Sequence, residues 1–234
     1  MKRLAACFLV LCATSSAQQP EAITYRFDEV KRTVTVTNAK AMRRVDKGAA
    51  AASGDAVETG WFSYALISAD HYRAKFEVYS STKVVLAEGT PGVILSLERG
   101  RIHAIFDKIT GNEPRIVKTP GALLAVRGTQ YSVNVENSGQ TTLDVFEGTV
   151  EVQSPLRREP FMVHAGQESV FSHREPPSSR DMPKGRQPDG RTRGDEGQRQ
   201  PQDGNHRGPG PGDHGGPQPM PMPPQGGGGR PPRP

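Results

Sequence analysis

Cysteine is nearly absent from this chain of 234 residues, which contains only Cys7 and Cys12. Both lie in an N-terminal stretch with a basic start, an apolar run over residues 4–13 and small residues up to Ala17. This order is typical of a secretory signal peptide over residues 1–17, and it predicts a periplasmic or extracellular location. The mature chain would then lack cysteine, which excludes disulfides, thiol catalysis and cysteine-ligated metals.

Long apolar runs are also missing. Residues 4–13 are too short for a bilayer core of about 30 Å, which takes about 20 apolar residues, and no longer run follows. We therefore expect no transmembrane helix in the mature chain. A lipid anchor is the weaker alternative, because Cys7 precedes most of the apolar run and Cys12 follows a bulky leucine.

Core-forming side chains are absent from the C-terminal part of the chain. From Arg174 onward there is no Phe, Tyr, Trp, Leu, Ile or Val, whereas 15 of the 21 prolines and 14 of the 26 glycines lie there. Such a segment buries too little apolar surface to offset the entropy of ordering it. The sequence thus predicts one folded domain over residues 21–173 and a disordered Pro/Gly/Arg-rich tail over residues 174–234.

The folded part has no excess of either charge. The formal net charge is +5, but residues 18–173 contain 18 basic and 18 acidic side chains. The excess comes from Lys2, Arg3 and the tail, where 10 basic residues face 7 acidic ones. Nucleic-acid-binding domains usually show a basic stripe with interleaved aromatic residues, which this domain lacks. We therefore expect no nucleic-acid partner.

Apolar residues alternate with polar ones along most of the domain. Val34 and Val36 alternate with threonines, Phe76 alternates with Lys75 and Glu77, and Val133 alternates with Ser132 and Asn134. This period of two predicts strands with one buried face, so we expect an all-β fold. Residues 39–52 are interpreted as a loop or edge segment.

Two glycine-centred pieces repeat about 48 residues apart, at residues 97–102 and 145–150, a period found in repeat architectures. A third glycine, Gly128, separates two apolar runs within residues 119–135, where it suits a bulge or a positive-φ position. Five such short motifs occur in order, and together they resemble the FecR domain over residues 34–171. The motif residues are Gly54, Asp55, Thr59, Gly60, Gly100, Thr119, Pro120, Arg127, Gly128, Thr129, Glu147, Gly148, Gly166 and Gln167.

The resemblance implies a FecR-like β-sandwich or solenoid-like β domain, and the sequence leaves both open. It also implies a link to regulators in which a cytoplasmic region controls a sigma factor and a periplasmic domain receives a signal from an outer-membrane transporter. A signal peptide would leave no part of this chain in the cytoplasm, so direct sigma-factor control is not expected.

Catalytic motifs are missing as well. There is no histidine pair at i, i+4 and no H-E-x-x-H, and Ser63 lacks both glycines of a nucleophile elbow. His103 is interpreted as a solvent-facing strand residue. Trp61 is interpreted as a core or rim anchor beside Phe62, with an exposed stacking platform as the alternative. The sequence predicts no enzyme activity, no cofactor and no metal site.

Three functions remain open. The first is an exported, non-enzymatic binding module of the bacterial cell envelope that recognises a protein or polysaccharide partner. The second is a periplasmic signal-relay component of a sigma-factor/anti-sigma system, and the third is an envelope hydrolase. We expect the partner to bind a sheet edge or the loops at residues 54–60 and 89–92, because loops on a rigid scaffold commonly carry recognition.

Overall fold

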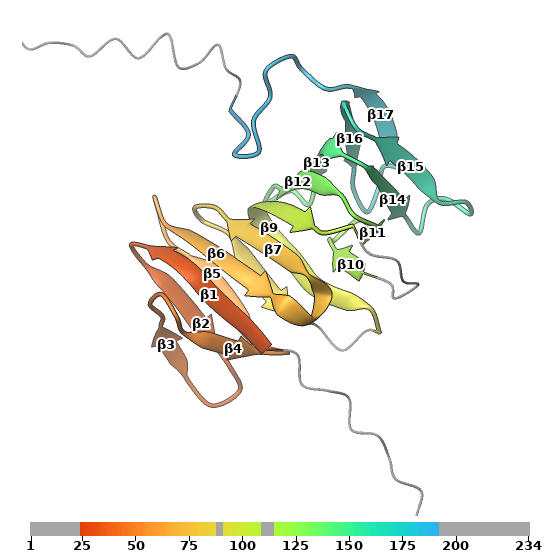
Figure 1. Cartoon of the computed structure of the whole chain (residues 1–234). Helices are drawn as coiled ribbons and strands as arrows, with labels where there is room; N and C mark the ends of the chain where they lie inside the picture. Colours follow the sequence, from red (N-terminus) through yellow and green to blue (C-terminus); the bar gives the residue numbers. More distant parts are fainter. Residues whose placement is uncertain (1–23, 88–90, 109–114, 192–234) are drawn as a thin grey trace, which may run out of the picture. The chain divides into compact units, whose positions relative to one another are not determined.

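The protein is described by a computed structural model, in which residues 24–87, 91–108 and 115–191 are placed (Figure 1). These residues form strands and one 3-10 turn, which confirms the all-β prediction, and no helix among them is long and apolar enough to cross a membrane. The expected signal peptide and residues 192–234 of the expected tail lie outside the described residues. The elements are β1 Thr24–Lys31, β2 Val34–Thr37, β3 Met42–Arg44, β4 Ala50–Ala52, β5 Ala56–Thr59, β6 Tyr64–Ala69, η1 Asp70–Tyr72, β7 Ala74–Val78, β8 Lys83–Leu86, β9 Val93–Phe106, β10 Arg115–Lys118, β11 Leu123–Val126, β12 Gln130–Val135, β13 Thr141–Glu147, β14 Thr149–Gln153, β15 Phe161–His164, β16 Gln167–Phe171 and β17 Ser178–Asp181.

The strands form two sheets that share the long strand β9 (Figure 1). The first sheet has the order β4-β1-β6-β7-β9-β12-β13-β16-β17, and all its pairings are antiparallel. The second has the order β3-β2-β5-β8-β9-β10-β11-β14-β15, with one parallel pairing between β9 and β10. The segment expected as a loop or edge contains β3 and β4, which lie at one end of each order.

Glycines mark places where the chain passes from one sheet to the other. Gly100 lies inside β9 where the pairing changes sheet, since Arg99 pairs in the second sheet and Gly100 pairs in the first. Gly148 separates β13 from β14. Both have positive φ angles, of 88° and 82°. The two glycine-centred repeats of the sequence are therefore the same structural event, a crossing between sheets. This path combines features of the two architectures that the sequence left open. Two sheets enclose the core, as in a β-sandwich, while the chain coils from one sheet to the other, as in a solenoid.

The core is one apolar cluster supplied by both sheets. Tyr25, Phe76 and Val133 come from the first sheet, and Val57 and Val150 come from the second; all five are fully buried. Alternate residues of strands such as β2, β7 and β14 face this cluster, as the period of two predicts. Residues of opposite phase point away from the core, and some of them form the polar row described below.

The folded part extends beyond the boundary expected at His173. Strand β17 pairs with β16 in antiparallel register, and Met182 donates from its backbone to the carbonyl of Gly166 at 2.8 Å. The tail prediction is thus corrected for residues 174–191. The prediction of a disordered tail rested on the lack of apolar side chains. Residues 174–191 are instead attached to the domain by backbone pairing and by arginine–carboxylate contacts.

Candidate functional site

The motif residues shared with the FecR pattern build turns and crossings. Asp55 accepts from the backbone of Ala52 at 3.1 Å, and the hydroxyl of Thr59 donates to the carbonyl of Tyr79 at 2.5 Å. Thr119 closes the turn to Ala122 with its backbone and its hydroxyl. Gly54 lies in the middle of the β4–β5 connection, Gly60 begins the β5–β6 connection, and Pro120 is an exposed turn residue. Gly166 and Gln167 form another turn, where Gln167 accepts from the backbone of His164 at 2.9 Å.

One group of motif residues does come together in space. The Gly128 and Gly148 turns touch: a Cβ on Gly148 would lie 2.9 Å from the carbonyl oxygen of Gly128 and 2.8 Å from Cγ2 of Thr129. Glu147 pairs with Lys108 at 2.8 Å over the same place. Gly128 has a φ of 66°, as the sequence predicted. Lys108, Arg127, Gly128 and Gly148 line a shallow groove of about 480 Å³. The tight packing of the two turns explains the glycines without a ligand.

Trp61 and Phe62 form an exposed aromatic pair, so the interpretation of Trp61 as a core residue is wrong. Their exposed fractions are 81% and 72%, and their ring centroids lie 6.2 Å apart in edge-to-face geometry. Phe62 has a φ of 54°, and the guanidinium of Arg32 lies 5.7 Å from its ring. Large aromatic side chains exposed together on a rigid scaffold are typical of recognition surfaces.

A groove lies on each side of the aromatic pair. Trp61 borders a groove of about 570 Å³ whose wall includes Glu58, Arg99 and Asn137, and Arg99 forms an ion pair with Glu58. Phe62 borders a groove of about 610 Å³, which is otherwise lined by Ser63, Tyr64, Tyr79, Ser80, Ser81, Gly100, Arg101, Asn134, Asp189 and Arg191. Gly60 lines the first groove, so one of the loops expected to bind a partner does lie at this surface; in the other, residues 89 and 90 lie outside the described residues.

A row of polar residues crosses the outer face of the first sheet. Glu77 lies opposite His103, His103 opposite Ser132, Ser132 opposite Asp144, and Asp144 opposite Glu168. Sequence reasoning placed His103 and Ser132 on this face correctly, but expected both to be solvated. They are 6% and 0% exposed. Each strand contributes one residue, so no local motif could reveal the row.

Glu77 is the most strongly bonded carboxylate at one end of this row. It accepts from the hydroxyls of Tyr79 at 2.7 Å and Tyr64 at 3.3 Å, and Nδ1 of His103 lies 3.0 Å away. The hydrogen bond with His103 is the largest of the influences that lower the pKa of Glu77, to about 2. Burial and the Glu77 carboxylate raise the pKa of both tyrosines.

The order Glu77–His103–Ser132 resembles that of a hydrolase triad, yet its hydrogen bonds differ. The hydroxyl of Ser132 donates to the carbonyl of Pro188 at 2.6 Å, and Nε2 of His103 has no hydrogen-bond partner within the described residues. A triad serine needs its histidine as proton acceptor. In residues 24–87, 91–108 and 115–191, no group of three or more His, Asp or Glu side chains could hold a metal ion.

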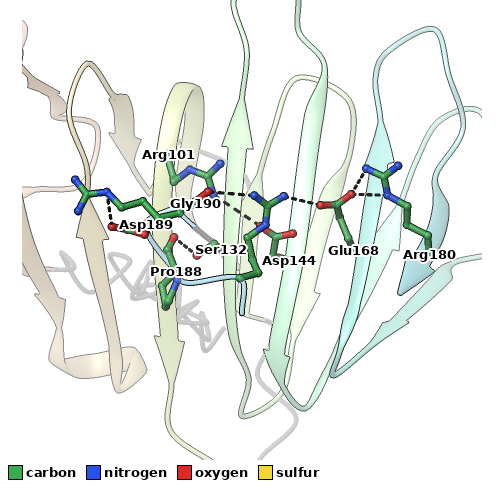
Figure 2. Close-up of polar contacts among 10 residues, drawn as sticks. Arg101, Ser132, Asp144, Glu168, Arg180, Pro188, Asp189 and Gly190 are labelled. Carbon is green, nitrogen blue, oxygen red and sulfur yellow. Dashed lines mark hydrogen bonds and ion pairs between the residues drawn. The ribbon is translucent and has the colours of Figure 1, made fainter. Parts of the chain in front are cut away.

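The other end of the row is a buried cluster of carboxylates and arginines (Figure 2). Arg186 donates to Glu168 at 2.7 Å and lies 3.4 Å from Asp144, Arg180 donates to Glu168 at 2.7 Å, and Arg101 lies 3.8 Å from Asp144. Burial raises the pKa of Asp144 to about 6, with the Glu168 charge adding to the rise and Arg186 opposing it. Burial acts in the same direction on Glu168, but the two arginine hydrogen bonds outweigh it and lower its pKa.

Two coiled sheets around one core, structural turn motifs and an exposed aromatic pair characterise this β domain. Comparison with known families places it further: residues 55–151 match the family model described as "FecR protein", so the chain carries a FecR domain. No curated protein matches the sequence.

Two crystal structures, at 2.50 and 1.65 Å resolution, are similar to this chain, and each is described as a "putative anti-sigma factor from Parabacteroides distasonis ATCC 8503". The sequence identities are 15% and 16%, and the TM-scores are 0.45 and 0.44. Each comparison covers 54% of this chain and 59% of the other, so the shared part spans about three fifths of those proteins.

Proposed function

We propose that this chain is an exported, non-catalytic component of a FecR-type signal relay, and that it acts by binding a protein in the bacterial cell envelope. The FecR domain over residues 55–151 carries this proposal. Resemblance to FecR-type regulators implies that such a domain receives a signal from an outer-membrane transporter. A relay component therefore accounts for the domain better than a binding module with no signalling role.

The exposed aromatic pair supports binding as the mode of action. Trp61 and Phe62 offer rigid apolar area, and the grooves beside them offer charged and polar side chains such as Glu58, Arg99 and Asn134. An apolar centre with a polar surround is the usual anatomy of a protein–protein interface. Tryptophan and tyrosine side chains frequently dominate the binding energy of such interfaces.

The proposal can be tested by capturing partners on the immobilised full chain from envelope extracts of the source bacterium, with identification by mass spectrometry. We expect an outer-membrane transporter or a membrane regulator of a sigma factor. The variant Trp61→Ser/Phe62→Ser should lose this partner by tenfold or more, about the effect of one or two interface anchors. The control Leu156→Ser/Met162→Ser removes two other side chains that are 46% exposed and should retain it.

A genetic readout separates the relay from a simple adhesin. Deleting the gene should change transcription of a sigma-dependent operon, and the Trp61→Ser/Phe62→Ser variant should fail to restore it. A retained polysaccharide, together with unchanged sigma-dependent transcription, would favour the non-signalling binding module. An N-terminus that stays uncleaved in cell fractions would contradict export.

A further inference from the structure

Residues 182–191, here named the strap, run from β17 across the outer face of the first sheet (Figure 2). The carbonyl of Pro188 accepts from Ser132 at 2.6 Å. Gly190 packs on the guanidinium of Arg101, since a Cβ there would lie 2.5 Å from Cζ. A turn closes the strap's end, where Gln187 donates from its backbone to Arg191 at 2.8 Å. The strap is therefore a ligand-like segment seated on a sheet face.

The face beneath the strap bears two carboxylates. Asp144 points away from the core, because its neighbours Leu143 and Val145 are core residues, yet the Asp144 and Glu168 side chains are each only 1% exposed. Burying a carboxylate is unfavourable unless cations and donors compensate it. Here the compensation comes largely from two arginines after His173, Arg180 in the edge strand β17 and Arg186 in the strap.

The contacts at the two carboxylates are unequal. Glu168 receives arginine hydrogen bonds from both Arg180 and Arg186. Within the described residues Asp144 accepts no hydrogen bond, and its nearest cations, Arg186 and Arg101, lie at 3.4 and 3.8 Å. A carboxylate can accept two parallel bonds from one guanidinium. Asp144 thus retains acceptor capacity that the strap leaves unused, and a better-placed arginine would bind there more tightly.

Residues 178–191 are attached to the rest of the domain by contacts of a weak type. All four residues of β17 are exposed, β17 is the last strand of its sheet, and the strap has the sequence M-P-K-G-R-Q-P-D-G-R. Segments held by few apolar contacts and solvent-exposed hydrogen bonds open at low free-energy cost. Removal of β17 would leave the backbone of β16 free to pair with another extended chain, a common mode of peptide recognition.

We propose that Asp144, Glu168 and the edge of β16 form a docking surface for an extended, arginine-bearing segment of a partner protein, which the chain's own residues 178–191 occupy until they are displaced. The partner segment would pair antiparallel with β16, set one arginine opposite Glu168 as Arg180 does, and direct a second to Asp144. This inference is independent of the relay proposal, because it rests on a segment of the chain itself.

The test measures binding in trans of a fluorescent peptide with the sequence of residues 178–191 to the full chain. The unmodified chain should bind it poorly, because its own segment competes at high effective concentration. The Arg180→Gln/Arg186→Gln chain, whose own segment is weakened, should bind at least about tenfold more tightly. The matched control is Arg26→Gln, which removes a surface ion pair with Asp28 on the same sheet and should bind like the unmodified chain.

Two further arms keep the test decisive. A peptide in which the arginines equivalent to Arg180 and Arg186 are replaced by glutamine should lose binding to the Arg180→Gln/Arg186→Gln chain, and this arm needs no change to the folded core. Adding Asp144→Asn/Glu168→Gln to that chain should abolish binding, with thermal unfolding checked in parallel. The proposal is overturned if the Arg180→Gln/Arg186→Gln chain binds the peptide no more tightly than the unmodified chain does. It is also overturned if the glutamine-substituted peptide binds that chain as tightly as the unsubstituted peptide does.

Discussion

Replacing Gly100 by alanine tests the account of the sheet crossings, and Gly54 provides a matched control. Both glycines have a φ of 88°. A Cβ on Gly100 would lie 2.6 Å from Cα of Thr82 and 2.8 Å from its Cβ, whereas nothing lies within 4 Å of a Cβ on Gly54. The two substitutions therefore share the backbone strain and differ in the steric overlap.

The expected magnitudes follow from these two components. Positive φ costs an alanine about 1–2 kcal/mol relative to glycine, so Gly54→Ala should lower the free energy of unfolding by about that amount. Overlap with a backbone that cannot move freely adds about 1–3 kcal/mol at Gly100. Thr82 is held there by a hydrogen bond from the backbone of Arg101 to its hydroxyl at 3.0 Å, which the overlap would also strain.

Urea unfolding of the two full-length variants, monitored by tryptophan fluorescence and circular dichroism, measures the difference. We expect Gly100→Ala to be less stable than Gly54→Ala by at least about 1 kcal/mol, with a correspondingly lower midpoint. Equal losses in the two variants would refute the steric argument, because strain alone would then account for both. A loss at Gly54 but none at Gly100 would refute the described crossing altogether.

Three other predictions test the polar row and the strap. Glu77→Gln should lower the free energy of unfolding by about 1–3 kcal/mol at pH 7, allowing for solvent screening. In a series of urea unfolding curves, the difference in this free energy from the unmodified chain should shrink as the pH falls from about 4.5 to about 2. The direction follows because a depressed carboxylate pKa means that the unfolded chain takes up protons first; a pH-independent difference would count against it. Ser132→Ala removes the bond to Pro188, so trypsin should cut the strap several times faster while overall stability falls by only about 1 kcal/mol. Ending the chain after residue 191 should leave the free energy of unfolding within about 1 kcal/mol of that of the full chain. Ending it after residue 173 should lower it by roughly 1–3 kcal/mol; the loss is smaller than for a broken ion pair that stays buried, because water then reaches the Asp144 and Glu168 carboxylates. Equal effects of the two truncations would show that the strap does not pack on the sheet.

Much of the fold is predictable because its determinants are local. Alternation identifies strands such as β2 and β12. The glycine spacing identifies Gly100 and Gly148 as centres of a repeated unit, although the sequence does not show that these units are crossings between sheets. The FecR resemblance rests on turn residues that occur in a fixed order along the chain. These features depend on the nearest neighbours in the sequence, which a single chain displays directly.

The candidate surfaces depend on contacts that no local pattern displays. Trp61 and Phe62 sit in an apolar stretch that suggests a core, but both lie in the connection between β5 and β6, where Phe62 has a φ of 54° and both rings are exposed. Ser132 has the phase of a solvent-facing residue and is nevertheless covered by Pro188, which lies 56 residues further along the chain. Burial of this kind requires knowledge of which distant segment returns to the sheet.

The strap also connects the two surfaces described here. Asp189 and Arg191 line the groove that Phe62 borders, and Arg101 lines the same groove while it faces Asp144. A partner that displaced the strap from Asp144 and Glu168 would therefore remove one wall of the groove beside the aromatic pair. Because Asp189 and Arg191 belong both to the displaced segment and to that groove, we expect docking at the carboxylates to change the affinity of a partner at the aromatic pair, and linkage requires the reverse effect to have the same factor.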